Sequence, residues 1–445
     1  MNPISELSRI PIILLLLSFY SLANNKSCAL LITDPPFNIL PNNISVSYHR
    51  LIQAALDSAS RGGGLVEMPI GQFALDSPIT IPQGVTLKGS WEGPHDAILD
   101  KGTTIRTKWG EGNKEEAPLI SMNKGATIEG ISVYYPRQVV KTPFNALQYP
   151  WTISLNYSDC NVINVTLANA YQGIKAEKGH ERHFIYNVHM CALKTGIWID
   201  RCWDMGRIEN VNIHQCYWWA SNPEARKATD AISTFTLSNL NGFVIGHTDW
   251  EQMIGCFVYQ AAWGIRFQKG ADWNDSLQTN LLASGCFIAG GCDLCHCSIE
   301  VERVHPAVGF KFSSSQFLGV IDIDSTNNGP LQFDNCVFQH GWSTQPYIIG
   351  NKSRNSVLLA NSIFSKYNAS DSNNTVAIKA YSGSTLLSNC VFDQRCKNKC
   401  ANQIEQLDTA ASVLGVNLRF NGPARIYKKN PADTERVKLL NSLQF

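Results

Sequence analysis

Acid–base side chains gather in the turns that follow two short apolar strands. Asp200, Asp204, His247 and Asp249 carry carboxylates and an imidazole, which often act as general acids and bases in enzymes. His247 and Asp249 belong to the run Gly-His-Thr-Asp-Trp-Glu, which places one imidazole and two carboxylates within five residues. We take these four residues as catalytic candidates, against the alternative that they only hold the turns together.

Aromatic and basic side chains near these candidates could bind a sugar. A tryptophan ring offers a flat apolar face with a polar edge, and arginine or lysine pairs with acidic groups. The same charges could instead form a solvated face, and Trp198 could simply pack beneath a loop. The substrate-binding candidates are Trp198, Arg201, Trp219, Arg266 and Lys311.

Three kinds of activity remain open for such a set. A glycoside hydrolase needs two carboxylates, about 5–5.5 Å apart in retaining and about 6.5–9.5 Å apart in inverting enzymes. A polysaccharide lyase abstracts the proton beside a uronate carboxyl, whose charge arginine, lysine or calcium would neutralise. A non-catalytic glycan-binding or cell-wall protein would use the same surface for binding alone. We assign no metal ligand, although Ca²⁺ on Asp200 and Asp204 would have the oxygen donors that it prefers.

A short repeat must position these residues. Gly173-Ile174 recurs as Gly196-Ile197, 23 residues later, and Asn164, Asn187 and Asn210 follow the same interval. A unit this short cannot bury its own apolar face, so it must stack on its neighbours. The repeat therefore predicts an all-β solenoid, a single-stranded parallel β-helix. The asparagines are expected to form hydrogen-bonded ladders in its turns.

Strand alternation then predicts which side chains face outward. Ile174, Ile197 and Ile265 should share one interior row, because successive side chains point to opposite faces. Gly309 follows Gly264 by 45 residues, which we interpret as two coils. The outward stripe would then contain Lys175, Trp198, Val244, Arg266 and Lys311. Residues 214–229 interrupt the rhythm and could wall a cleft beside the stripe.

The segment from Gly62 to Ser90 contains "LVEMPIGQF" and "ITIPQGVTLKGS" after a short amphipathic helix. It resembles the opening coils of the pectate-lyase superfamily domain, which includes rhamnogalacturonase- and epimerase-like proteins. The resemblance runs from about Ser45 to about Phe392 and implies a right-handed β-helix and activity on a polysaccharide. The set Asn-x-Asp, Asp-Asp, Gly-His-Gly and Arg-x-Lys is missing, so a plain polygalacturonase is not implied.

The chain divides into four expected parts. Residues 1–23 resemble a signal peptide, with Arg9 before a short apolar run and small residues at its end. Residues 24–61 form an N-terminal segment with a capping helix, residues 62–392 the β-helix, and residues 393–445 a C-terminal cap or tail. A soluble, secreted protein is predicted, without membrane association after signal cleavage. We expect a monomer that binds a polysaccharide.

Fourteen cysteines follow the expected signal peptide, an even number that suits an oxidising compartment. The run Cys292-Asp-Leu-Cys295-His-Cys297 superficially resembles a zinc cluster, but in a secreted chain disulfides are favoured. At least one disulfide is expected among Cys286, Cys292, Cys295 and Cys297.

Charge and sequons agree with an extracellular glycoprotein. The net charge is +1, with no basic block of the kind that nucleic-acid binding needs. Glycosylation is expected at Asn43, Asn156, Asn274, Asn351, Asn368 and Asn373. The sequence thus predicts a secreted polysaccharide lyase or glycoside hydrolase, or else a non-catalytic glycan-binding protein on the same scaffold.

Overall fold

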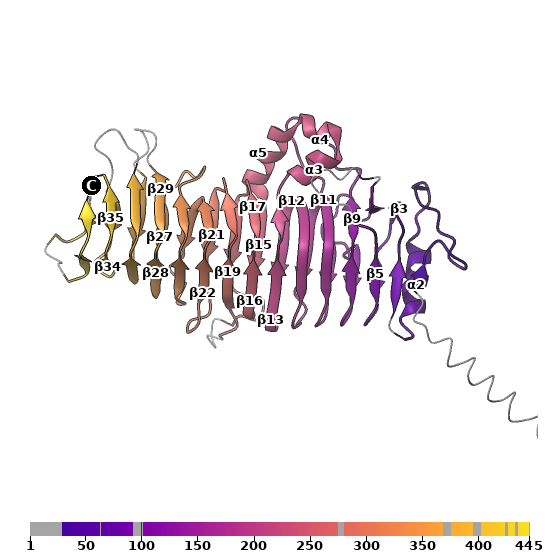
Figure 1. The fold of residues 1–445 in the computed structure, drawn as a ribbon, viewed down its shortest axis with the longest axis horizontal. Helices are drawn as coiled ribbons and strands as arrows, with labels where there is room; N and C mark the ends of the chain where they lie inside the picture. The colour runs from indigo at the N-terminus through magenta and orange to yellow at the C-terminus, as the bar shows by residue number, and fades with distance from the viewer. Residues whose placement is uncertain are drawn as a thin grey trace, which may run out of the picture.

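The computed structural model describes residues 29–62, 64–91, 99, 101–274, 280–367, 375–394, 402–422, 426–431 and 435–444. These residues form 38 strands that pair in parallel in one continuous sheet, wound into an elongated solenoid (Figure 1). A strand pairs with the strands one coil before and after it, so the strands line up in three faces. The parallel β-helix predicted from the repeat is confirmed. The predicted signal peptide lies outside the described residues.

The first face holds the Gly-Ile strands. It contains β4 (Ile79–Ile81), β7 (Ile120–Met122), β10 (Trp151–Leu155), the ends of β11 (Asn161–Ala176) and β12 (Phe184–Ile199), β15 (Asn241–Ile245), β18 (Trp263–Phe267), β21 (Cys297–Val301), β24 (Val320–Ile323), β27 (Tyr347–Asn351), β30 (Val376–Ala380), β33 (Ile404–Gln406) and β36 (Ile426–Lys428).

The other two faces complete each coil. The second face contains β1 (Leu30–Leu31), β2 (Leu65–Glu67), β5 (Thr86–Lys88), β8 (Thr127–Glu129), β13 (Cys202–Glu209), β16 (Thr248–Ile254), β19 (Ala283–Ile288), β22 (Phe310–Ser313), β25 (Leu331–Asp334), β28 (Ser356–Ala360), β31 (Ser384–Ser388), β34 (Ser412–Val416) and β37 (Val437–Leu440). The third face contains β3 (Gly71–Ala74), β6 (Thr103–Arg106), β9 (Ile131–Tyr134), β14 (Asn212–Ile213), β17 (Phe257–Tyr259), β20 (Gly291–Asp293), β23 (Gln316–Leu318), β26 (Val337–Gln339), β29 (Ile363–Tyr367), β32 (Val391–Gln394), β35 (Arg419–Asn421) and β38 (Leu443–Gln444).

The interior rows follow from strand alternation. Ile174 lies opposite Ile197, which lies opposite Phe243, which lies opposite Ile265. All four side chains are fully buried. Burying one such side chain stabilises a fold by about 1.5–3 kcal/mol, so stacked rows of this kind hold the coils together. The predicted interior row is confirmed.

The turn asparagines form the expected ladders. Asn164, Asn187 and Asn210 all adopt a left-handed backbone conformation, with φ of 53°, 53° and 52°. Among residues with a side chain, asparagine accepts this conformation most readily, because its short amide can bond locally. Asn187 Nδ2 donates to Asn164 Oδ1 over 2.7 Å, and Asn210 Nδ2 donates to Asn187 Oδ1 over 2.8 Å.

The outward stripe departs from the prediction after Arg266. Arg266 lies opposite Glu300, and Glu300 lies opposite Asp322. Lys311 instead lies on β22 of the second face, opposite Cys286, with its ammonium 5.6 Å from the ring centre of Trp250. The interval of 45 residues therefore does not mark two coils of one face. A long connection between β18 and β19 shifts the later strands, which is why counting residues failed here.

The parallel pairing does not stop at Phe392. Strands β33 to β38 continue all three faces, within the segment that we expected to be a C-terminal cap or tail. Phe420 stacks on Phe392 with ring centres 4.9 Å apart, and Asn417 Nδ2 donates to Asn389 Oδ1 over 3.1 Å. The same row and the same ladder thus run on into this segment.

Helices lie at one end and on one side of the solenoid (Figure 1). Helix α2 (His49–Ala59) buries Ile52 and Leu56 and contacts β2 and β4 at the N-terminal end. Its role as a cap remains a prediction. Helices α3 (Cys216–Ser221), α4 (Pro223–Lys227) and α5 (Thr229–Asn239) form the insertion between β14 and β15. None of the helices in the described ranges has the length and apolar character needed to span a bilayer.

The cysteines correct the expected disulfides. All eleven described cysteines, including Cys286, Cys292, Cys295 and Cys297, are free thiols, so the disulfide expected among these four is wrong. Cys292 and Cys295 are fully buried and serve as small apolar side chains of the interior. Burial raises the pKa of Cys256 to about 12 and that of Cys336 to about 11, which keeps both thiols protonated. Cys28, Cys396 and Cys400 lie outside the described residues.

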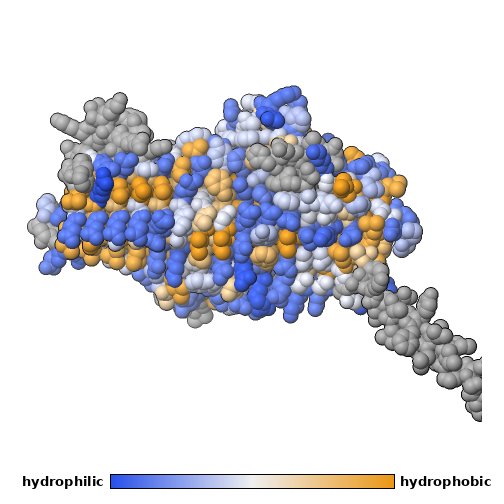
Figure 2. Space-filling view, viewed as in Figure 1, coloured by the Kyte–Doolittle hydropathy of each residue, from blue (hydrophilic) through white to orange (hydrophobic). Residues whose placement is uncertain are grey.

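The expected glycosylation sites differ in exposure. Asn351 is fully buried and donates to Thr385 Oγ1 over 3.1 Å, so it has no room for a glycan, and this expectation is wrong. Asn274 is exposed, and Asn43 and Asn156 are partly exposed. Asn368 and Asn373 lie outside the described residues. Figure 2 shows that hydrophilic and hydrophobic rows alternate along the C-terminal half of the surface, as the outward side chains of stacked strands would produce.

Candidate active site

Three charged side chains stand in line on the first face. Arg266, Glu300 and Asp322 occupy matching positions on β18, β21 and β24 and are only partly exposed. Neighbouring parallel strands lie about 4.8 Å apart, so the two carboxylates are next to each other. This line replaces the predicted stripe beyond Arg266.

Glu300 is held from two directions. Arg266 Nε donates to Glu300 Oε2 over 2.5 Å, and Trp263 Nε1 donates to Glu300 Oε1 over 3.1 Å. The Arg266 guanidinium also lies 4.5 Å from the ring centre of Trp263, and its Nη1 donates to Asn241 Oδ1 over 2.9 Å. These contacts fix the orientation of both the carboxylate and the guanidinium.

Asp322 has a cation and a phenol beside it. Lys352 Nζ lies 3.0 Å from Asp322 Oδ1. Burial raises the pKa of Tyr347, and the charge of Asp322 and a hydrogen bond to it raise it further. Tyr347 therefore stays protonated and can donate to this carboxylate. The Lys352 ammonium also lies 5.9 Å from the ring centre of Tyr381.

A cavity of about 420 Å³ opens over these carboxylates. Leu237 and Ser238, at the end of α5, and the loop residues 343–345 form parts of its wall. The predicted insertion, residues 214–229, contributes no residue to this lining; the wall comes instead from the end of α5, which continues the insertion to Asn239. We call this cavity the groove; it is lined by Leu237, Ser238, Ala262, Trp263, His296, Cys297, Glu300, Val320, Asp322, Ser343, Thr344 and Gln345.

The predicted Trp198 lies on the same face, two coils before Arg266. It stands in the outward line between Lys175 and Val244 and is partly exposed. Its ring centre is 6.0 Å from that of Trp151, and Lys175 Nζ is 6.0 Å from the Trp151 ring centre. These residues extend the line of aromatic and cationic side chains beyond the groove.

Asp200 holds turns together. Its side chain is buried, and its oxygens accept hydrogen bonds from three backbone amides, those of Arg201 (2.9 Å), His247 (2.8 Å) and Ala271 (2.9 Å). Gly246 and Gly270 leave room for this carboxylate, because a Cβ at either would lie within 2.7 Å of Asp200 Oδ1. The geometry supports a structural role.

Asp204 and Arg201 have other partners. Arg182 Nη1 lies 3.0 Å from Asp204 Oδ2, and Arg201 Nε lies 2.9 Å from Asp272 Oδ1. Backbone and arginine hydrogen bonds keep the pKa of Asp204 below its usual range. Amide donors already point at Asp200, whereas a cation needs free oxygen atoms. Asp200 and Asp204 therefore do not fit a shared calcium site.

His247 and Asp249 do form a pair. His247 Nε2 lies 3.0 Å from Asp249 Oδ1, and the imidazole is fully buried while the carboxylate is 55% exposed. Trp203 packs its ring edge on the imidazole with centres 4.5 Å apart. The pair is outside the groove lining. The structure thus brings together Asp200, His247 and Asp249 in one turn cluster, and separately places Arg266 beside Glu300.

A second buried polar cluster lies at the second face. It joins β13 and β16 to the turn that precedes β12. His180 Nε2 lies 2.9 Å from His183 Nδ1, and His183 Nε2 lies 3.0 Å from Glu251 Oε1. Thr248 Oγ1 donates to Glu251 Oε2 over 3.0 Å. Cys202 Sγ lies 3.8 Å from His183 Nδ1. Neither histidine is among the candidates of the sequence analysis.

The two histidines of this cluster titrate in opposite directions. Burial, together with the charges of His183 and His247, lowers the pKa of His180 to about 3. Burial also disfavours charge on His183, but the Glu251 carboxylate and hydrogen bonds with Cys202 and Glu251 outweigh it and raise the pKa of His183 to about 10. The cluster therefore holds a charged His183 between Glu251 and a neutral His180.

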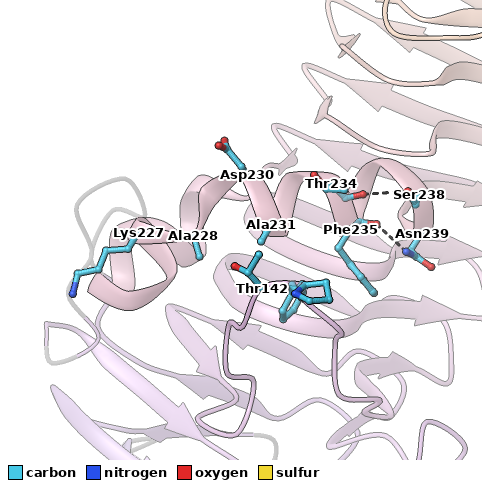
Figure 3. Close-up of a pocket in the computed structure, with 11 residues that line it drawn as sticks. Thr142, Lys227, Ala228, Asp230, Ala231, Thr234, Phe235, Ser238 and Asn239 are labelled. Atoms are coloured by element: carbon cyan, nitrogen blue, oxygen red, sulfur yellow. Dashed lines mark hydrogen bonds between the residues drawn. The ribbon is translucent and has the colours of Figure 1, made fainter.

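The largest cavity among those described lies beneath α5 and has a volume of about 620 Å³ (Figure 3). Figure 3 shows that Lys227 and Asp230 point their charged ends away from Thr142 and Phe235. No pair of acid–base groups converges on the space within the residues that line it. Trp219, predicted to bind sugar, lies on α3, partly buried, with its ring 5.8 Å from that of His214. It is not part of the groove lining.

Glu300, Asp322 and Trp263 were missed by the sequence analysis. The signal that could have found them is the alternation in Ser298-Ile-Glu-Val301 and Val320-Ile-Asp-Ile323, where a carboxylate stands between two buried apolar residues. The fixed interval of 23 residues hid this signal, because the turns between strands vary in length.

Known proteins resemble this chain only in structure. No protein-family model matches it, and no curated protein matches it in sequence. The A-module of mannuronan C-5 epimerase AlgE6 from Azotobacter vinelandii matches with a TM-score of 0.55 at 11% identity, over 94% of this chain and 99% of that one. DFA-IIIase from Arthrobacter chlorophenolicus A6, without its lid, matches with 0.54 at 10% identity, over 92% and 98%.

A third match is the Dettilon tailspike protein, with a TM-score of 0.51 at 11% identity, over 92% of this chain and 70% of that one. Likeness at such low identity concerns the fold and leaves the chemistry of each site open. By its strand pairing and by this likeness, the chain is a parallel β-helix protein.

Proposed function

We propose that the protein is a secreted glycoside hydrolase that cleaves an acidic glycan in the groove. The observation that carries this proposal is the pair Glu300 and Asp322, which stand on adjacent coils beneath one cavity. Hydrolysis of a glycosidic bond needs two carboxylates, one to protonate the leaving oxygen and one to attack or to activate water. Secretion rests on the apolar N-terminal run.

The neighbouring side chains fit an acidic sugar. Trp263 offers an indole at the groove wall on which a sugar ring could stack. Arg266 and Lys352 lie beside the two carboxylates and would pair with the acidic group of a uronate. The shared fold of a mannuronan epimerase agrees with such a substrate by analogy only.

A lyase is the second candidate, and the same two cations favour it. Arg266 and Lys352 could neutralise a uronate carboxyl while the neighbouring proton is abstracted. The two reactions leave different products. A hydrolase creates one reducing end per cut, while a lyase also creates an unsaturated uronate that absorbs ultraviolet light.

The test is incubation of the secreted protein with a panel of acidic and neutral polysaccharides, with both products measured. Glu300→Gln and Asp322→Asn should each lower turnover at least about 100-fold, because each removes an acid–base group. Glu129→Gln is the matched control. Glu129 is also a strand glutamate that pairs with a cation, Lys88, but it lies on β8 of the second face. Parent-like turnover of both groove variants would overturn the proposal, and binding without cleavage would favour the non-catalytic alternative.

A further inference from the structure

The cluster of His180, His183 and Cys202 has the composition of a metal site. One ligand atom of each residue lies within 4.8 Å of the other two, and all three side chains are buried. Two imidazoles and a thiolate are the donors that zinc and related transition metals prefer. They are not the donors of calcium or magnesium, which take oxygen ligands.

The distances are close to those of a tetrahedral site. With bonds of about 2.0–2.1 Å to nitrogen and about 2.3 Å to sulfur, two ligand atoms lie roughly 3.3–3.6 Å apart. The separation between Cys202 Sγ and His183 Nδ1 is 3.8 Å, and that between His180 Nε2 and His183 Nδ1 is 2.9 Å. The remaining pair, His180 and Cys202, lies within 4.8 Å, so side-chain movements on the order of 1 Å would close the three ligands around an ion.

Glu251 orients the central histidine. Its carboxylate lies 3.0 Å from His183 Nε2 and is itself held by the Thr248 hydroxyl. A carboxylate on the far nitrogen is the usual support of a metal-bound histidine, because it directs the other nitrogen at the ion. Here the other nitrogen is His183 Nδ1, which faces Cys202 and His180.

His180 supplies an independent observation. Its Nδ1 atom is buried and has no hydrogen-bond partner, although the side chain is only 1% exposed. Burying an imidazole nitrogen without a partner costs free energy, so a turn role alone does not account for this residue. An ion bound at one ring nitrogen would take the place of the hydrogen bond between His180 and His183, and ring rotation only exchanges which His180 nitrogen has no partner.

The surroundings of the cluster leave room for its side chains. A cavity of about 290 Å³ lies next to the cluster and is lined by Arg182, His183, Phe184, Asp204, Met205 and Arg207, while the His183 imidazole itself is fully buried. A Cβ at Gly206 would lie 2.2 Å from His183 Cε1 and 2.4 Å from Glu251 Oε2. Glycine at this position therefore keeps room for the histidine and its carboxylate.

We propose that His180, His183 and Cys202 bind one transition-metal ion of the zinc type, with Glu251 as the positioning residue. His180 and His183 lie in the turn before β12, and Cys202 is the first residue of β13, which pairs with β12 one coil later. The bound ion would therefore link two successive coils. This site is separate from the groove, and it does not depend on the proposed hydrolase activity.

The experiment measures zinc in the purified full-length protein after equilibration with Zn²⁺ and removal of the unbound ion. We expect close to one zinc per chain, and a thiolate-to-metal charge-transfer absorption when Co²⁺ is the probe. Cys202→Ala and His180→Asn should each lose the ion and the absorption. Cys336→Ala is the matched control, because Cys336 is also buried in the interior, and it should keep both.

Folding of each variant is checked by circular dichroism, so that lost binding is distinguished from lost structure. A folded parent that retains no zinc would overturn the proposal even if every variant failed to fold. Equal zinc binding by parent and folded Cys202→Ala would do the same. Zinc that increases the thermal midpoint of the parent, and not that of folded His180→Asn, would support it.

Discussion

Glu300 receives one hydrogen bond from the Arg266 guanidinium and one from the indole of Trp263, and Trp263 also lines the groove. A carboxylate held in this way has little freedom to rotate. An enzyme reacts faster when its reacting groups are already held in place before the substrate binds. The entropy cost of ordering them is then not part of the activation free energy. Under the proposed function, Arg266 and Trp263 would therefore hold the acid–base group in place, and Trp263 would also meet the sugar.

His189 provides a pH prediction at the same scale. Its ring nitrogens lie 3.0 Å from Tyr217 Oη and 3.0 Å from Asn187 Oδ1, and Trp91 stacks on it. Burial lowers the pKa of His189 to about 4, whereas an unfolded histidine has a pKa of about 6.5. Burial also raises the pKa of Tyr217, which stays neutral over this range.

Between pH 6.5 and 4 the unfolded chain binds a proton that the folded His189 does not. The stability that neutral His189 provides is therefore present above about pH 6.5 and is lost as the pH falls towards 4. We expect His189→Gln to lower the slope of unfolding free energy against pH by up to about 1.4 kcal/mol per pH unit in this window. Urea unfolding at several pH values measures it, and an unchanged slope would contradict the assignment.

The sequence predicted the kinds of groups at the site better than their places. It identified Arg266 and Trp198 on the correct face, because alternation along a strand is local. It could not show that Asp200 is covered by three backbone amides, since those amides come from three different turns. The pairing of Glu300 with Asp322 depends on register between coils, which a fixed interval cannot supply once a turn lengthens.

At the scale of elements, the asparagine ladders hold the turns in register. Asn389 has φ of 52°, donates to Asn361 Oδ1 over 3.1 Å and accepts from Asn417 Nδ2 over 3.1 Å. Most residues with a Cβ pay roughly 1–2 kcal/mol for this backbone conformation, and glycine does not.

Two substitutions separate the parts of that contribution. Asn389→Gly should lose the two amide hydrogen bonds, at about 0.5–1.5 kcal/mol each. Asn389→Ala should lose these and in addition about 1–2 kcal/mol from the left-handed conformation. The difference between the unfolding free energies of the two variants in urea measures the cost of the left-handed backbone conformation for a residue with a Cβ. Equal stability of the two variants would show that this turn tolerates a Cβ without strain.

The whole molecule shows where repeat-based prediction succeeds and fails. The interval of 23 residues predicted the β-helix and its interior row, because every coil repeats the same packing problem. It did not predict that strands continue past Phe392, since the later coils are longer and the asparagine ladder is their clearest common mark. The even number of cysteines likewise led to a wrong prediction of a disulfide, because a thiol in a stacked interior serves as a small apolar side chain.

Those eleven free thiols have a consequence for the protein after it unfolds. Folded, most are sealed from oxidants and stay protonated. When the protein is heated in air and unfolds, these thiols become exposed together on one flexible chain. Random oxidation can then form disulfides between cysteines of different coils, which would block refolding. We expect recovery of the native circular dichroism after heating with a reductant, and poor recovery without one. Equal recovery in both conditions would show that oxidation is not what makes heat damage permanent.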